Sequence, residues 1–212
     1  MQVLGYILVI AAAYLLGSIP FGYLAGRAKG VDIRKVGSGN IGATNAMRIL
    51  GKPAGITVLL LDACKGYAAV VWVAPGLAGW LGWDMASMEL LRIAAGMAVV
   101  LGHNYTCWLR FKGGKGIATS AGVLVALVPW ALLIILSIWI ILTLLTRYVS
   151  VGSIAAALAL PFASWATGES LTMILVTGAL GALALYKHRG NMQRLWQGNE
   201  TRLGGGRKET TS

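Results

Sequence analysis

Charge is scarce in this chain, and acidic charge is the scarcest. Charged residues make up 12% of the 212 residues, about half the share that is usual in soluble domains. Hydrophobic residues make up 57%, and the mean hydropathy is +0.73. These values exclude an ordinary soluble domain and predict an integral membrane protein.

Acidic residues and cysteines are also too scattered to form a metal centre. Cys64 and Cys107 show neither metal-ligand spacing nor a disulfide framework. Asp32, Asp62 and Asp84 stand far apart, which excludes a CDP-alcohol phosphotransferase, because that class of enzyme needs clustered metal-binding aspartates. We therefore predict no metal and no cofactor.

The charge that is present is mostly positive. Lys and Arg number 18 against 7 Asp and Glu, which gives a net charge of +11 and a pI near 10.1. In a soluble protein this balance would indicate nucleic acid. Here the cations lie between and after apolar runs, as they do on the inner face of a membrane. We expect a lipid bilayer as partner and no nucleic acid.

Apolar runs long enough to span a bilayer occupy most of the chain. We expect an all-α integral membrane protein with one membrane-embedded domain over residues 1–203 and a disordered polar tail over 204–212. Pro20 should bend the first run, and Pro75 should end the second. The runs are 3–25, 53–74, 85–101, 117–146, 149–167 and 171–186.

Topology follows from the placement of the cations. The cation-rich stretches 27–52, 110–115 and 187–208 should face the cytoplasm, and the cation-free turns near Asp84 and Glu169 should face outward. This parity holds only if the run 117–146 is broken at Pro129. The result is about seven transmembrane or membrane-embedded helices, with the N-terminus outside and the C-terminus cytoplasmic. The helix before Pro129, about 12 residues or roughly 18 Å long, is too short to cross a bilayer upright.

Two pairs of opposite charge lie inside the apolar runs. Asp62 and Lys65 are three residues apart, as are Glu89 and Arg92. Residues at this spacing meet on one face of a helix. Both pairs are therefore predicted to form ion pairs that help to fold the bundle.

A first polar stretch, GSGNIGATN at 37–45, is followed by Arg48. Its glycines allow the backbone to approach a ligand, and its side chains supply neutral hydrogen-bond donors. The alternative is a turn with a helix N-cap, which Ser, Thr and Asn favour. The candidate ligand-binding residues here are Ser38, Gly39, Asn40, Thr44, Asn45 and Arg48.

A second stretch, GHNYTCWLRFKGGKG at 102–116, runs directly into an apolar segment. A glycine-rich loop at a helix start favours a phosphate or another anion. It is not a nucleotide-binding P-loop, because Gly116 stands where Ser or Thr is required and no glycine stands at Leu109. A flexible basic loop is the alternative. The candidate anion-binding residues are His103, Lys112, Gly113, Gly114, Lys115 and Gly116.

A third stretch begins the basic tail. It contains His188, Asn191, Arg194, Glu200 and Arg202. A histidine at a helix end among cations should favour its neutral form. It could serve as a base, or its role could be structural.

The three stretches together resemble the motifs of the bacterial acyl-phosphate:glycerol-3-phosphate acyltransferases, over roughly residues 14–202. The resemblance implies transfer of an acyl group from acyl phosphate to glycerol 3-phosphate, giving 1-acyl-glycerol-3-phosphate (lysophosphatidate) and phosphate without coenzyme A. It also implies the bacterial inner membrane, an active site facing the cytoplasm, and, as a further candidate partner, the soluble enzyme that supplies acyl phosphate. The family has a proline where this chain has Thr106.

The resemblance assigns roles to Ser38 and Arg48, to the glycine-lysine loop, and to His188, Asn191 and Glu200. Ser38, His188 and Asn191 are the predicted catalytic residues; Glu200 and the candidates of the first two stretches are predicted to bind substrate.

The chemistry of the residues agrees with this assignment. An acyl phosphate is an activated mixed anhydride, so no covalent enzyme nucleophile is required. The common acyltransferase signature, a histidine five residues before an aspartate, is absent, since Trp108 follows His103 and Gln193 follows His188 at that spacing. The base is His188 or the phosphate of the substrate. A carrier of organic phosphates is the alternative function, although carriers usually show internal repeats and charge at mid-membrane, whereas here the cations gather on one face and no repeat is visible.

Overall fold

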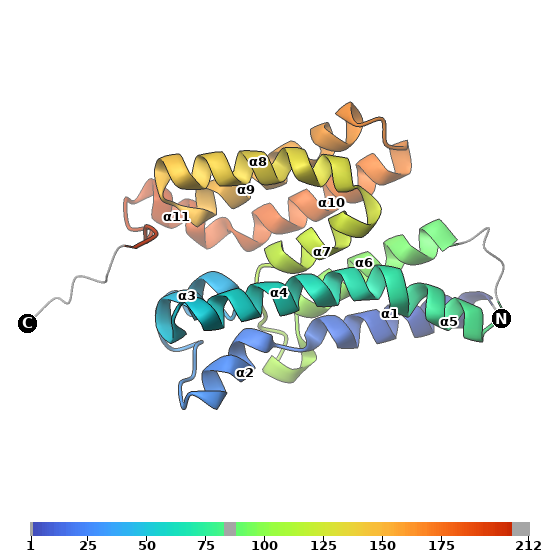
Figure 1. Ribbon diagram of the computed structural model, residues 1–212, viewed down its shortest axis with the longest axis horizontal. Coiled ribbons are helices and arrows are strands. Elements are labelled where there is room, and N and C mark those ends of the chain that lie inside the picture. The colour runs from blue at the N-terminus through green and yellow to red at the C-terminus, as the bar shows by residue number, and fades with distance from the viewer. Residues whose placement is uncertain (1, 83–87, 205–212) are drawn as a thin grey trace, which may run out of the picture. The chain divides into compact units, whose positions relative to one another are not determined.

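The computed structural model describes residues 2–82 and 88–204, and in these ranges all regular structure is helical (Figure 1). Most helices are apolar and closely follow the predicted runs. In chain order they are α1 (Gln2–Ser18), α2 (Phe21–Ala28), α3 (Ala43–Leu50), α4 (Lys52–Ala68), the π-helical turn η1 (Ala69–Val73), α5 (Ala74–Trp80), α6 (Met88–Asn104), the 3-10 turn η3 (Cys107–Leu109), α7 (Ile117–Leu127), α8 (Pro129–Thr146), α9 (Val149–Ala166), α10 (Leu171–Lys187) and α11 (Arg189–Trp196).

The chain divides into two compact units, residues 1–132 and 133–212. The first contains α1 to α7, and the second contains most of α8 and all of α9 to α11. A single domain over 1–203 stays a prediction. The predicted disordered tail lies outside the described residues from 205 onward.

Glycines allow the helices of the first unit to pack closely. A Cβ at Gly17 on α1 would meet the carbonyl oxygen of Val99 on α6, and one at Gly122 on α7 would meet that of Ala63 on α4. Close backbone approach at small residues is a common packing mode of membrane helices. It holds α1 against α6 and α4 against α7.

Prolines interrupt the helices in two different ways. Pro20, which lacks an N–H and cannot continue the ladder, separates α1 from α2, so the predicted irregularity is confirmed. The predicted end at Pro75 is wrong, because the helix continues through η1 into α5 and reaches Trp80. The Ala74 N–H donates to the Ala69 carbonyl five residues back. This wider turn places Pro75 in the first turn of α5, where no N–H is needed.

The third apolar run begins in a part of the chain that is not described, because residues 83–87, including Asp84, lie outside the described ranges. Its helix, α6, ends later than predicted, at Asn104. His103 and Asn104 therefore stand on the last turn of a helix, directly before the basic loop.

The predicted break at Pro129 is confirmed. α7 ends at Leu127, Val128 has φ −141° and ψ 63°, and α8 begins at Pro129. A residue before proline is pushed out of the helical region by the proline ring. The result is the short apolar helix that the charge parity requires.

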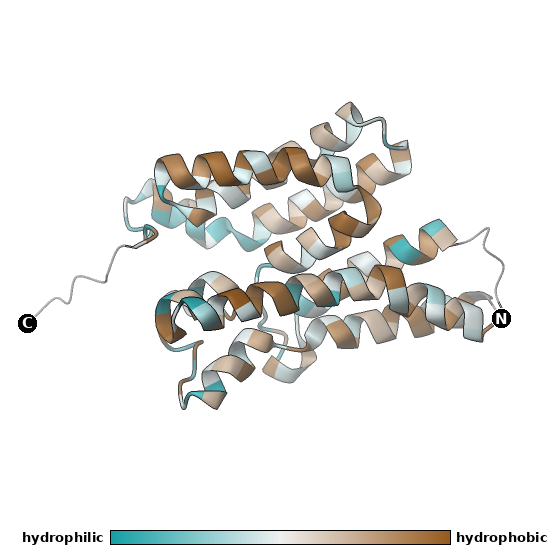
Figure 2. Ribbon diagram, in the orientation of Figure 1, coloured by the Kyte–Doolittle hydropathy of each residue, from teal (hydrophilic) through white to brown (hydrophobic). Residues whose placement is uncertain are grey.

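The second unit was predicted less completely. α10 and α11 meet at a bend of 53° at His188, and α11 was not expected. Within this unit, α8 is hydrophobic along its length, whereas α11 and the residues after it are mainly hydrophilic (Figure 2).

Four helical segments of the described residues are long and apolar enough to cross a membrane, and five if α10 and α11 form one bent span. The four are Val3–Ala28, Lys52–Trp80, Pro129–Thr146 and Val149–Ala166. The count of seven segments and their orientation stay predictions.

Candidate active site

The GSGN loop is built around one buried side chain. The Asn45 amide, 1% exposed, accepts a hydrogen bond from the Ser38 N–H at 2.9 Å. Its Nδ2 donates to the carbonyl oxygens of Ile33, Val36 and Asn40 at 3.1, 3.2 and 2.9 Å. Asn45 was predicted to bind substrate, but its amide is occupied by the backbone of its own loop. The structure therefore gives it the geometry of a residue that shapes the loop.

Two glycines of this loop adopt the left-handed conformation, Gly37 with φ 61° and Gly39 with φ 69°. Ser38 and Gly39 are exposed as a result. The Asn40 Oδ1 accepts from the Gly42 N–H at 2.8 Å, and α3 starts one residue later with Gly42 as its N-cap. The predicted loop therefore leads directly into a helix, but the alternative of an N-cap by Ser, Thr or Asn is not seen, because the N-cap is Gly42 and no side chain caps the helix.

Thr44 and Arg48 follow on α3. Thr44 is half-buried in the first turn of the helix, and Arg48 is exposed in its last turn. A small apolar cluster packs beneath this region: Ile33, Ile41, Ala46, Leu50, Val58 and Leu109.

The second stretch folds back on the end of α6. The Gly113 N–H donates to the Asn104 carbonyl at 3.2 Å, and the Gly114 N–H donates to the His103 carbonyl at 3.0 Å. These two N–H groups, which we expected to be offered to an anion, are used inside the protein. Gly116 has φ 81° and is the N-cap of α7.

Gly113 and Gly114 are required by packing. A Cβ at Gly113 would meet the His103 carbonyl oxygen, and one at Gly114 would meet Nε2 of the His103 ring. His103 itself is buried. Binding of substrate by His103 stays a prediction. The structure shows that His103 packs against the glycine loop and supports it.

Thr106 holds a backbone conformation that would suit the proline implied by the resemblance. Its φ of −61° and ψ of 127° match the φ that a proline ring fixes. Its hydroxyl donates to the Ser18 carbonyl at 2.6 Å, which ties the loop to the end of α1.

A pocket of about 350 Å³ opens between the first two stretches. It brings together Gly39, Lys112 and Gly113, three of the predicted site residues. It is lined by Asp32, Arg34, Lys35, Gly39, Ile41, Lys112 and Gly113.

Three charged residues of this pocket were missed at the sequence level. The Arg34 guanidinium binds both carboxylate oxygens of Asp32, at 2.9 and 2.7 Å. The hydrogen bond from Arg34 lowers the pKa of Asp32 to about 2, so the pair stays charged in all ordinary buffers. Lys35 supplies a further cation. The signal was the DIRK sequence at 32–35, which ends one residue before GSGN and lies in the cation-rich stretch 27–52.

Of the two predicted intramembrane ion pairs, one is confirmed. Lys65 Nζ lies 2.8 Å from Asp62 Oδ1, and both side chains are buried. Among the described residues no ion pair joins Glu89 to Arg92, so that prediction is wrong. Glu89 stands exposed in the first turn of α6, where the helix dipole already favours an acidic side chain.

The third stretch lies in the second unit. His188 is 3% exposed at the bend between α10 and α11, and its Nδ1 lies 2.8 Å from the Ala184 carbonyl oxygen. Since a carbonyl can only accept, Nδ1 carries the hydrogen, and Nε2 is the basic nitrogen of the neutral ring.

Asn191 and Glu200 bind one another. The Asn191 Nδ2 donates to Glu200 Oε1 at 2.6 Å, and the Arg194 Nε donates to Glu200 Oε2 at 2.7 Å. Burial raises the pKa of Glu200, but the hydrogen bonds from Asn191 and Arg194 outweigh it, so the pKa lies below its usual range. Glu200, predicted to bind substrate, thus holds the segment after α11 against that helix. No group of three or more metal-binding side chains occurs within the described ranges.

Comparisons with known proteins agree with the motifs. The family model "Glycerol-3-phosphate acyltransferase" matches residues 7–198. The chain belongs to the glycerol-3-phosphate acyltransferase family. It is 46% identical to the glycerol-3-phosphate acyltransferase of Desulforudis audaxviator over 96% of this chain and 98% of that protein. It is 42% identical to that of Chlorobaculum parvum over 97% of this chain and 99% of that protein.

Solved structures of the family give the same result. The crystal structure of PlsY (YgiH), an integral membrane glycerol 3-phosphate acyltransferase, in its glycerol 3-phosphate form matches with a TM-score of 0.85 and 38% identity, covering 94% of this chain and 96% of that one. Its lysophosphatidic acid form matches with a TM-score of 0.82 and 37% identity. The predictions of an all-α integral membrane protein and of a glycerol-3-phosphate acyltransferase are confirmed.

Proposed function

We propose that this acyltransferase takes its acyl group from acyl phosphate and that the pocket of the first unit holds a substrate phosphate. The observation that carries the proposal is the pocket itself, which joins the GSGN loop to the GGKG loop and is lined by Lys35 and Lys112. Two lysines beside glycine backbone that carries no side chain suit a phosphate group. The structure of a relative in a glycerol 3-phosphate form is further support.

The reaction needs no enzyme-bound intermediate. The terminal hydroxyl oxygen of glycerol 3-phosphate attacks the acyl carbonyl carbon, and the bond between that carbon and the bridging oxygen of the phosphate breaks. The hydroxyl proton passes to a base, and inorganic phosphate leaves with the electron pair of the broken bond. The lysines stabilise charge on phosphate, and the catalytic power comes from positioning and electrostatics.

Roles follow from the contacts of each residue. Ser38 and Arg48 are the polar side chains of the first motif that are exposed beside the pocket loop, and we assign them to contact substrate. Lys112 and Lys115 hold phosphate by charge. His188 is assigned as the base through Nε2, with the phosphate of the substrate as the competing candidate, and Asn191 orients the attacking hydroxyl.

The decisive experiment on the donor uses purified protein with acyl phosphate and glycerol 3-phosphate in the absence of acyl-CoA. Formation of lysophosphatidate and phosphate in equal amounts is expected. Product that appears only when acyl-CoA is added would contradict the proposed donor.

Kinetics of single variants test the assigned roles. Lys112→Ala and Lys115→Ala should raise KM for glycerol 3-phosphate about tenfold or more, because a lost charge-assisted hydrogen bond costs about 1.5–3 kcal/mol. Lys52→Ala is the matched control, since Lys52 is exposed at the start of α4 and does not line the pocket. His188→Ala should lower kcat by about 10²–10⁴. A normal kcat in that variant would make the substrate phosphate the base.

We also propose the inner membrane of a bacterium, a pocket that faces the cytoplasm, and a soluble enzyme as the supplier of acyl phosphate. Excess Lys and Arg around the pocket supports this orientation. Single cysteines at Gly79 and Gln197, both exposed, in a background without Cys64 and Cys107, should be labelled from opposite sides of the membrane. Labelling from one side would contradict the seven-segment topology.

A further inference from the structure

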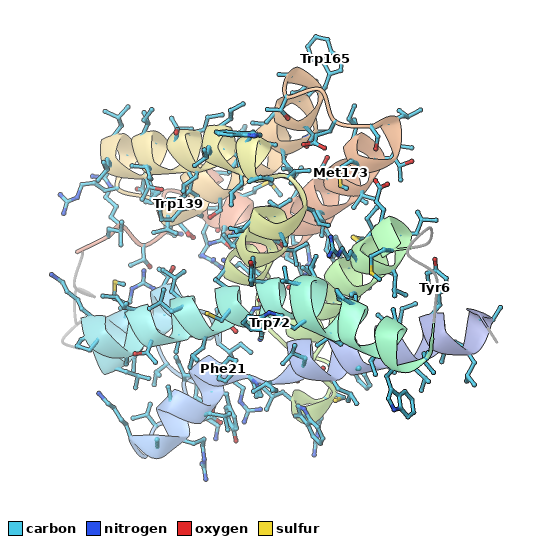
Figure 3. The ribbon with its side chains drawn as sticks, turned by 45° about the vertical axis from the view of Figure 1, so that its right-hand side comes forward. Tyr6, Phe21, Trp72, Trp139, Trp165 and Met173 are labelled. Atoms are coloured by element: carbon cyan, nitrogen blue, oxygen red, sulfur yellow. The ribbon has the colours of Figure 1, made fainter. Side chains whose placement is uncertain are left out.

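A chain of buried contacts runs through the first unit, from the break between α1 and α2 to the glycine loop. At one end, Lys65 Nζ donates to the Ile19 carbonyl at 2.9 Å. This carbonyl directly precedes Pro20, where the regular helix has ended. Lys65 Nζ also lies 5.4 Å from the centre of the Phe21 ring, which is labelled in Figure 3.

In the middle of this series of contacts, the Asp62 carboxylate lies close to both Lys65 and His103. Its Oδ1 lies 2.8 Å from Lys65 Nζ and 3.4 Å from His103 Nδ1. All three side chains are buried. The longer distance exceeds that of a well-formed hydrogen bond, so the ring lies beside the carboxylate as a close neighbour.

At the other end, the opposite side of the imidazole supports the loop. Nε2 of His103 occupies the space that a Cβ of Gly114 would need. The carbonyl of the same residue accepts the Gly114 N–H at 3.0 Å. The position of the His103 ring therefore fixes the height of the loop segment next to Lys112 and Gly113, which line the pocket.

We propose that Asp62, Lys65 and His103 are positioning residues, which hold the glycine loop at the height where the pocket binds phosphate. The usual explanation of a buried ion pair is a contribution to folding, but such a pair is weak evidence for stability, because desolvation offsets the attraction. This pair also connects two parts of the site. Lys65 contacts the Ile19 carbonyl, and Asp62 lies beside the His103 ring, which in turn lies against Gly114. The inference rests on the proposed phosphate-binding role of the pocket.

The test removes both charges together. Asp62→Asn with Lys65→Met leaves no uncompensated buried charge, so the protein should fold and melt like the wild type. Its Kd for glycerol 3-phosphate, measured by calorimetry without a donor, should rise about tenfold to a hundredfold because the loop is misplaced. A wild-type Kd in a folded double variant would overturn the proposal.

A cycle with the loop glycine keeps the test valid if the double variant folds poorly. His103→Ala removes the ring, which creates room for a Cβ at position 114. Adding Gly114→Ala to His103→Ala should therefore change Kd by less than about twofold, whereas Gly114→Ala alone should weaken binding far more, because only then does the Cβ meet the ring. If the two substitutions instead raise Kd by independent factors that multiply in the double variant, the His103 ring does not support the loop.

The same measurements separate this proposal from the proposed function. If Lys112→Ala binds glycerol 3-phosphate like the wild type, the pocket is not the phosphate site. If Lys112→Ala binds weakly and the Asp62→Asn, Lys65→Met variant binds normally, the pocket assignment stands and the positioning role fails.

Discussion

In the loop 37–42, Gly37 and Gly39 have φ of 61° and 69°, and the loop is exposed around them. Across the pocket, Gly113 and Gly114 do not adopt positive φ, and they lie against the backbone and ring of His103. The first pair of glycines supplies a backbone conformation that other residues rarely adopt, and Gly37 also leaves room for Oδ1 of Asn45, which a Cβ would meet. The second pair is needed because there is no room for a side chain at either position.

The two loops also differ in what holds them. The GSGN loop is held by a side chain, the amide of Asn45, which bonds to backbone groups at four positions. The GGKG loop is held by its own N–H groups on α6. At Gly39 a Cβ would come no closer than 3.0 Å to the Arg34 carbonyl oxygen, so this position should depend mainly on dihedral angles, whereas Gly114 should depend mainly on side-chain size. Substitutions that separate conformation from volume should therefore affect the two loops in opposite ways.

The largest effect is expected at Gly114. Gly114→Ala places a methyl group against Nε2 of His103, so either the ring or the loop must move. A displacement of about 1 Å near a reacting site can cost a hundredfold in rate, and we expect a loss of that order in kcat/KM. Gly76→Ala is the matched control, because a Cβ there meets nothing within 4 Å. Near-normal turnover of Gly114→Ala would mean that the loop is not set by volume.

A series at Gly39 should show the opposite dependence. Asn tolerates the left-handed conformation better than Ala or Val does. Gly39→Asn should therefore retain more activity than Gly39→Ala, and Gly39→Val should retain least. Alanine costs about 1–2 kcal/mol in this conformation, which corresponds to roughly a tenfold loss if the loop must hold its shape to bind. At Gly114 the order should be reversed, with Asn worse than Ala because it is larger.

If both positions rank their substitutions by size, the contrast between the loops is wrong. Thermal melting of each variant separates loss of fold from loss of activity. Gly30 is the matched control for conformation: it has φ 71° and no atom within 4 Å of a Cβ, so Gly30→Asn and Gly30→Ala report the conformational cost alone.

Local rules predicted those features that depend on neighbours in sequence. The break at Pro129 followed from charge parity and from the steric effect of proline, and the Asp62–Lys65 pair followed from helical spacing. Spacing alone failed for Glu89 and Arg92, because Glu89 stands at the exposed start of its helix. Pro75 was misread because a π-helical turn before it has no signature in hydrophobic periodicity.

The site residues could be found from the sequence, but not what they contact. Asn45 looked like a ligand-binding amide, yet three carbonyls that surround it come from residues brought together only by folding. Lys35 was one cation among many in the sequence, and only the fold shows that it lines the same pocket as Lys112. The dependence of Gly114 on His103 is likewise a tertiary contact, which no motif records.

The segment after α11 is held in a third way, by the hydrogen bonds of the Glu200 carboxylate to Asn191 and Arg194. The pKa of Glu200 is lowered in the folded protein, so its contribution to stability is present above the unfolded value of about 4.5 and is lost as the pH falls through the lower folded value. Acid titration followed by the fluorescence of Trp196, which is 92% exposed on α11, should show this loss. Glu200→Gln should abolish that transition, whereas Gly39→Asn should leave it unchanged. A transition that persists in Glu200→Gln would assign it to another group.

The smallest effect is expected at Thr106, where the backbone is set by neither glycine nor charge. Thr106→Pro keeps φ, since −61° is the value that a proline ring imposes. It loses the hydroxyl bond to Ser18, at a cost of about 0.5–1.5 kcal/mol, and it regains about 0.4–1 kcal/mol by restricting the unfolded chain. Activity should therefore stay within about threefold of wild type, and Thr106→Val, which loses the bond without that gain, should melt at a lower temperature than Thr106→Pro. Should Thr106→Pro lose most of its activity while it still melts like the wild type, the hydroxyl bond would be a requirement of the GGKG loop, and that loop would depend on a side-chain hydrogen bond as the GSGN loop does.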